Sequence, residues 1–138
     1  MIIAVCGSLT HHKDLRAAQL ALEKLGHTAL VPKSLDLIEK QGYKKPVTVE
    51  ERLAAEAKYN FISEHFKKIE TADAILVVNM EKNGVAGYIG GNTFLEMGVA
   101  FYLKKKIYTL HPIPPVSYEL ELASMHPVVL DGDLSKLS

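Results

Sequence analysis

MIIAVCGSLTHHKDLRAAQLALEKLGHTALV, residues 1–31, decides the fold class of this chain. Its continuous apolar run at 1–6 stops at a Gly-Ser pair, which is typical of a strand buried on both faces of a parallel sheet. A helix then follows, because four apolar residues recur at helical spacing: Leu15, Ala18, Leu22 and Leu25. A short strand at 28–31 stops at a proline. The three pieces predict a βαβ unit.

The remaining chain continues this alternation of helices and strands. Residues 33–47 show no clear period, so we expect an irregular connection with at most a turn of helix near 35–39. The further predicted elements are a long helix from a capping box at 48–51 to about Thr71, strands at 74–79, 106–110 and 128–130, a helix starting near Asn92, a short helix at 118–125 and a frayed tail from Asp131. The pattern predicts a single α/β domain over 1–138, with a doubly wound, flavodoxin-like sheet of five parallel strands in the order 2-1-3-4-5 and helices on both faces.

Composition limits the class of partner. The chain has 138 residues, in which 16 Lys plus Arg balance 16 Asp plus Glu. This balance argues against a nucleic acid polymer or a membrane surface as partner, but leaves room for a small local basic patch. No apolar run of about 18 residues and no charged-then-apolar leader is present, which indicates a soluble cytoplasmic protein. The single cysteine, Cys6, is interpreted as a small buried strand residue.

The predicted sheet also indicates where a ligand binds. In an open parallel sheet, ligands bind beyond the carboxyl ends of the strands, where the strand order reverses. Gly7, Ser8 and Asn79 follow the first and third strands and are therefore candidate binding residues. The backbone amides after the first strand suit a phosphate or another anion, with an ordinary tight turn as the equal alternative. The pair His11–His12 has no cysteine or carboxylate at ligand spacing, so we expect no metal and no cofactor.

Residues 87–110, GYIGGNTFLEMGVAFYLKKKIYTL, place one carboxylate, Glu96, inside an apolar helical pattern that follows a glycine-rich loop. The candidate pocket residues of that loop are Tyr88, Gly90, Gly91 and Asn92, and Asn92 or Thr93 is expected to cap the helix. Glu96 has two interpretations. It either interacts with the helix start or a lysine, or acts as a nucleophile toward the anomeric carbon of a sugar, because glycosidic cleavage passes through an oxocarbenium-like state. The helix is apolar nearly all round, which predicts burial by the sheet and by a second subunit.

Three segments carry a resemblance to a known family: CGS at 6–8, IETADAILVVN at 69–79 and NTFLEMGVAFYLKKKIY at 92–108. Together they are similar to the nucleoside 2-deoxyribosyltransferase family, including its 2'-deoxynucleoside 5'-monophosphate N-glycosidase branch, and the chain resembles a divergent member. The resemblance implies that Glu96 takes the deoxyribosyl group, or plays the equivalent part in hydrolysis. It also implies a nucleoside or nucleotide substrate, and a homo-oligomer in which neighbouring subunits complete the pocket.

Two positions depart from the family pattern. Gly90 stands where the transferases usually have an aspartate and the hydrolase a serine. His65 stands where both tend to have an aspartate that assists the leaving base. His65 is therefore a candidate catalytic acid or base near neutral pH, or alternatively a histidine on the helix surface.

The leading hypothesis is an enzyme that cleaves or transfers at the N-glycosidic bond of a (deoxy)nucleoside or nucleoside monophosphate, with Glu96 and His65 as catalytic residues. The alternative is a nucleotide-binding or sensing module of the same fold with little or no catalysis. A third hypothesis is a structural oligomerisation domain, which rests only on the apolar helix around Glu96.

Overall fold

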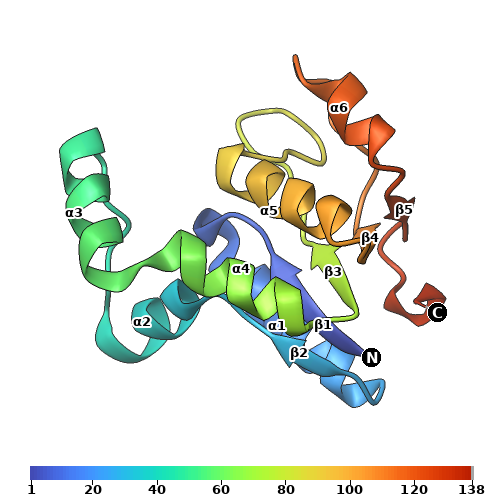
Figure 1. Cartoon of the computed structure of the whole chain (residues 1–138), viewed down its shortest axis with the longest axis horizontal. Helices are drawn as coiled ribbons and strands as arrows, with labels where there is room; N and C mark the ends of the chain where they lie inside the picture. Colours follow the sequence, from blue (N-terminus) through green and yellow to red (C-terminus); the bar gives the residue numbers. More distant parts are fainter. Residues whose placement is uncertain (138) are drawn as a thin grey trace.

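The structure, a computed structural model that describes residues 1–137, is an open sheet with helices on both faces (Figure 1). Its strands are β1 (Ile2–Cys6), β2 (Thr28–Leu30), β3 (Ala74–Val77), β4 (Lys106–Thr109) and β5 (Val128–Val129). Its helices are α1 (His12–Lys24), α2 (Lys33–Gln41), α3 (Val49–Tyr59), α4 (Phe61–Thr71), α5 (Gly91–Tyr102) and α6 (Glu119–Ser124), with 3-10 turns η1 (Leu9–His11) and η2 (Leu134–Lys136). All strand pairs are parallel, and the order β2-β1-β3-β4-β5 confirms the predicted flavodoxin-like sheet.

The sheet has a hydrophobic core on each face, because successive side chains of a strand point in opposite directions. Ile3 and Val5 of β1 pack with buried residues of α1 and α2. Ala4 and Cys6 point the other way and pack with buried residues of α4, α5 and α6. The last side chain of β1 therefore faces α4 and α5, at the carboxyl end of the sheet.

A full helix, α2, occupies residues 33–41, where at most a turn of helix near 35–39 was predicted, while residues 42–47 are irregular as predicted. Leu35 is fully buried in the core. The Arg16 guanidinium of α1 contacts the carboxylates of Asp36 and Glu39, each at 2.7 Å. Burial of one face of α2 and contacts with α1 therefore stabilise this helix.

The single long helix predicted over 48–71 is also wrong, since Asn60 separates α3 from α4. Asn60 has a left-handed backbone, with φ of 56°, and asparagine tolerates this conformation better than most residues. The predicted cap is present, because the Thr48 hydroxyl accepts a hydrogen bond from the Glu51 amide at 3.1 Å. However, α3 has no buried residue, and its Leu53 is 66% exposed.

The start of α5 and the tail of the chain differ from the prediction. α5 starts at Gly91 with Gly90 as its N-cap, so neither Asn92 nor Thr93 caps it as predicted. The tail from Asp131, predicted to fray, forms η2 and packs Leu134 and Leu137 against the core. These apolar contacts tie the tail to the sheet.

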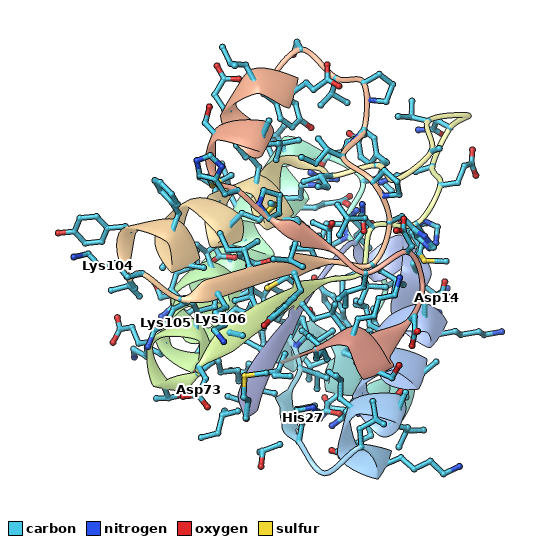
Figure 2. All side chains as sticks on the ribbon, turned by 90° about the vertical axis from the view of Figure 1, so that its right-hand side faces the viewer. Asp14, His27, Asp73, Lys104, Lys105 and Lys106 are labelled. Carbon is cyan, nitrogen blue, oxygen red and sulfur yellow. The ribbon has the colours of Figure 1, made fainter. Side chains whose placement is uncertain are left out.

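Charged residues fix the amino edge of the sheet, away from the candidate site. Asp73, Lys105 and Lys106 lie near one another there (Figure 2). The Asp73 carboxylate accepts a hydrogen bond from the Ile2 amide at 2.8 Å, and the Lys105 ammonium donates to the Glu70 carbonyl at 3.0 Å. Within residues 1–137, no helix combines the length and the apolar character needed to cross a membrane.

Candidate active site

A cavity of about 560 Å³ opens beyond the carboxyl end of β1, between the loop that follows this strand and the start of α5. This is the point where the strand order reverses, as predicted for a ligand site. α3 and α4 supply the opposite wall. The volume lies within the usual range for small-molecule sites and is sufficient for a nucleotide.

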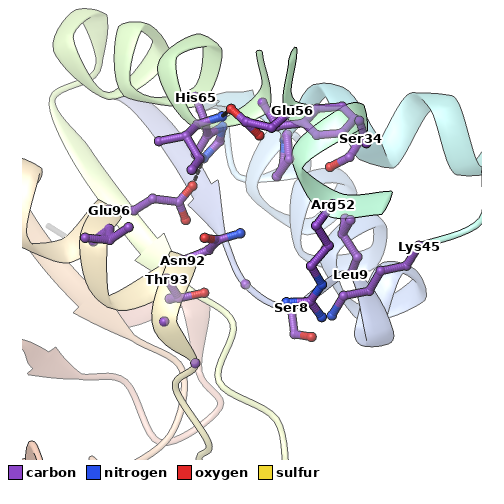
Figure 3. Close-up of a pocket in the computed structure, with 18 of the residues that line it drawn as sticks. Ser8, Leu9, Ser34, Lys45, Arg52, Glu56, His65, Asn92, Thr93 and Glu96 are labelled. Carbon is purple, nitrogen blue, oxygen red and sulfur yellow. Dashed lines mark hydrogen bonds and ion pairs between the residues drawn. The ribbon is translucent and has the colours of Figure 1, made fainter. Parts of the chain in front are cut away.

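α5 carries Glu96 into this cavity from its second turn. The Glu96 side chain is only 13% exposed, and its Oε2 lies 3.8 Å from Nε2 of His65 (Figure 3). The neighbour of Glu96 is thus a buried histidine and not a surface lysine. Glu96 lies beyond the first turn of α5, so the positive end of the helix dipole stabilises its negative charge only slightly. The carboxyl group is positioned toward the cavity.

His65 lies on α4 and is buried, which excludes the alternative of a surface histidine. It is 2% exposed and lines the cavity. Burial, followed by the positive charge of Lys68, lowers the pKa of His65 to about 4, although an interaction with the Val5 backbone carbonyl opposes this. Its Nδ1 has no hydrogen-bond partner of normal geometry. The imidazole is therefore neutral near pH 7.

Cys6 is the functional candidate that the sequence analysis missed. It is fully buried, as predicted, but its Sγ lies 3.5 Å from Nε2 of His65. Within residues 1–137, Cys6, His65 and Glu96 form the one group of three potential metal ligands, with their ligand atoms all within 4.8 Å of one another. Only the fold could reveal this group, because the three residues come from β1, α4 and α5.

Burial controls the protonation of this group. It raises the pKa of Glu96 to about 8, against a smaller opposing effect of a hydrogen bond with Cys6. It also raises the pKa of the Cys6 thiol, and the neighbouring Glu96 raises it further. Near pH 7 the three groups are therefore mostly uncharged, as a carboxylic acid, an imidazole and a thiol.

The far side of the same cavity is positively charged. Lys45, Arg52 and Lys82 line it. Partial desolvation, followed by the charges of Lys82 and Arg52, lowers the pKa of Lys45, which indicates positive charge that no neighbouring carboxylate neutralises. Figure 3 shows Arg52 and Lys45 directed toward Ser8, on the side away from Glu96 and His65. The balanced composition allowed a small local basic patch, and these cations form one. None of them was predicted as a site residue from the sequence.

Most of the predicted pocket residues meet at the cavity. Those that line it are Gly7, Ser8, Tyr88, Gly90, Gly91 and Asn92. Asn79 does not line it. Instead, its side-chain amide donates to the His111 carbonyl at 2.9 Å, and its carbonyl oxygen accepts from the His111 amide at 2.9 Å. Asn79 thus ties the loop after β3 to the loop after β4.

Gly7 shows how closely the cavity floor is packed. A Cβ at this position would lie 2.7 Å from Cδ2 of Leu15 and 3.1 Å from the Val78 carbonyl oxygen. Leu15 is fully buried, so neither neighbour can move easily. A glycine here allows the loop after β1 to pass directly over the core.

Comparisons with protein-family profiles, curated proteins and solved structures gave no significant match.

Proposed function

We propose that the protein cleaves the N-glycosidic bond of a (deoxy)nucleoside 5'-monophosphate and passes the sugar phosphate to water or to a second base. One observation carries this proposal: a single cavity is lined by a nearly buried carboxyl group, Glu96, and by three cationic side chains, Lys45, Arg52 and Lys82. A substrate that is electrophilic at one end and anionic at the other fits this arrangement.

Glu96 is the nucleophile in this proposal. Its ionised carboxylate bonds to the anomeric carbon while the C–N bond breaks, and the electrons of that bond leave with the base, which takes a proton from the solvent. Water, or the nitrogen of a second base, then attacks the anomeric carbon and releases the carboxylate. In the hydrolytic case, the water loses a proton as its oxygen bonds to the sugar.

His65 is the proposed general base of the second step. Its ring lines the cavity next to Glu96, and its pKa of about 4 leaves it neutral at pH 7, which is the form that accepts a proton. A role as the acid that protonates the leaving base is disfavoured for the same reason.

The cations favour a monophosphate over a free nucleoside. Lys45, Arg52 and Lys82 all line the cavity, and Lys45 and Arg52 point toward Ser8 (Figure 3). A phosphate group there gains charge-assisted hydrogen bonds, and arginine can bind two of its oxygens at once. A free nucleoside leaves these charges uncompensated.

The proposal includes membership, as a divergent branch, of the nucleoside 2-deoxyribosyltransferase family, and a homo-oligomeric state. An apolar groove of about 950 Å³ runs along α5, between α4 and α6. Leu95 is 51%, Phe101 51% and Tyr102 84% exposed beside it. Leu95 and Phe66 line both this groove and the cavity, so a second copy packed on α5 would also close the cavity. Light scattering should show a dimer or larger oligomer that Phe101→Glu dissociates, and a monomer at every concentration would contradict this.

The test of the activity is a substrate panel. Purified protein is incubated with deoxynucleoside 5'-monophosphates and with the matching deoxynucleosides, and free base is measured by chromatography. Release of base, faster from the monophosphates, is the expected result. No release from any member of the panel above the Glu96→Gln background would contradict the proposal.

A binding module with little catalysis is the second candidate. It is favoured by the neutral state of Glu96 and His65 at pH 7, because a protonated carboxyl is not a nucleophile. Calorimetry that shows tight binding of a monophosphate, together with no base release over long incubation at pH 8 or above, would favour this candidate.

A further inference from the structure

We propose that Cys6, His65 and Glu96 form a binding site for a zinc ion, with a fourth ligand position open to the cavity. The three side chains come from β1, α4 and α5 and meet beneath the cavity floor. The proposal rests on the ligand atoms alone, and it describes a metal-bound state that is distinct from the metal-free state in which Glu96 is the nucleophile and His65 the base.

Both distances are compatible with a tetrahedral metal, and the distance between His65 and Glu96 fits a metal better than it fits a direct hydrogen bond. A tetrahedral zinc with ordinary bond lengths separates a sulfur and a nitrogen ligand by about 3.5 Å, and a nitrogen and an oxygen ligand by about 3.3 Å. Here Sγ of Cys6 lies 3.5 Å, and Oε2 of Glu96 3.8 Å, from Nε2 of His65. The nitrogen–oxygen separation is too long for a hydrogen bond. A shift of Oε2 of Glu96 by about half an ångström toward His65 brings the two atoms to the separation of zinc ligands.

The types of ligand narrow the choice of metal. A thiolate, an imidazole and a carboxylate together match zinc, whereas magnesium and calcium bind almost only oxygen. His65 and Glu96 both line the cavity, while Cys6 lies behind them. A bound ion would therefore have three protein ligands and face the cavity with its fourth position, as in zinc sites that bind a water molecule or a substrate.

The surroundings also fit a metal site. His65 is 2% exposed, and its Nε2 lies 3.5 Å from Sγ of Cys6 and 3.8 Å from Oε2 of Glu96. The ring also interacts with the Val5 backbone carbonyl, and a backbone carbonyl is a usual outer partner of a histidine ligand. Zinc would displace the protons of the thiol and the carboxyl group, and would replace the weak contacts among these three buried groups with bonds to the metal.

Zinc titration of the full-length, chelator-treated protein tests the proposal. Calorimetry should show one ion per chain, with at least about tenfold weaker binding in Cys6→Ser, since the loss of even an outer-shell partner of a zinc ligand costs about this much. The matched control is His11→Ala, which removes a histidine outside the cluster and should leave the affinity unchanged. Thermal unfolding of each variant without metal shows whether it is folded.

Cobalt supplies a readout that does not depend on the stability of the variants. Cobalt bound by the native chain should give the absorption of a tetrahedral ion and a thiolate-to-metal charge-transfer band, and zinc should remove both. Absence of zinc binding, equal binding by Cys6→Ser, a loss in His11→Ala, or a cobalt spectrum without the thiolate band would each overturn the proposal. No substrate is used, so these outcomes are separate from the result of the base-release assay.

Discussion

The two sides of the cavity are built in opposite ways. On one side, Glu96 and His65 lie almost without solvent contact, and burial keeps both groups uncharged near pH 7. On the other side, Lys45 and Arg52 are exposed residues that keep their positive charge. The buried side depends on the core of the sheet. The charged side depends on α3 and the segment before it, which contribute nothing to that core.

This difference separates chemistry from recognition. A carboxyl group with a raised pKa gains reactivity from its exclusion from water, whereas cations that bind a phosphate must remain accessible to it. Changes on the buried side should therefore alter the rate of the chemical step, and changes on the charged side should alter the preference for substrate.

The largest effect is expected from the removal of the carboxylate. Glu96→Gln keeps the size of the side chain but cannot form a glycosyl ester, so base release should fall more than about 1,000-fold. Chromatographic measurement of kcat checks this, with Glu119→Gln, an exposed glutamate of α6, as the matched control. Activity that survives in Glu96→Gln would remove the assigned nucleophile.

The pH dependence should reflect the buried carboxyl group. With the pKa of Glu96 at about 8, the nucleophilic carboxylate is the minor form below that pH. In metal-free protein, kcat/KM should therefore rise about 50-fold between pH 6 and pH 8 and then level off, because the ionised fraction grows from about 1% to about half. Cys6 and His65, which face Glu96, stay uncharged over this range. A profile that is flat or falls would contradict the assignment of the ionised form as the reactive one.

On the charged side, Arg52→Ala should raise the KM for a nucleoside monophosphate about tenfold, because one charge-assisted contact to phosphate is lost. The KM for the matching free nucleoside should change little. Lys44→Ala is the matched control, since Lys44 is exposed and does not line the cavity. An equal loss for both substrates would show that Arg52 does not contact the phosphate.

The smallest effect is expected from the removal of an exposed side chain of α3, measured as the change in the free energy of unfolding. Leu53→Ala in α3 should change the free energy of unfolding by less than about 0.5 kcal/mol, because Leu53 is 66% exposed. Ile69→Ala in α4, which removes a fully buried side chain, should cost about 2–5 kcal/mol. Denaturant unfolding measures both, and similar values for the two would show that α3 is packed more tightly than its exposure indicates.

The sheet could be predicted from the sequence because its central strands, β1, β3 and β4, are buried on both faces over most of their length. Runs such as AILVVN at 74–79 have no polar alternation, and this signal is local. The helices were harder to predict. α2 depends on salt bridges from Arg16 in α1, and the division at Asn60 depends on a left-handed backbone that the apolar pattern does not show.

The candidate site was predictable only in part. Glu96 and the glycine-rich loop were found because they are contiguous and follow a strong strand. Cys6 was assigned to packing alone, since its contact with His65 depends on which face of β1 its side chain points to. Arg52 was missed because helical periodicity predicts which residues of α3 are apolar, but not that the break at Asn60 sets this helix beside the cavity.

The weak attachment of α3 has a consequence for protein engineering and for divergence among relatives. α3 stands apart from the body of the domain (Figure 1) and has no buried residue. Its sequence can therefore drift or be replaced without loss of the fold, and each replacement changes one wall of the cavity. The segment at 42–60 is a natural position for a library in which new substrate preferences are selected while the sheet and Glu96 stay constant.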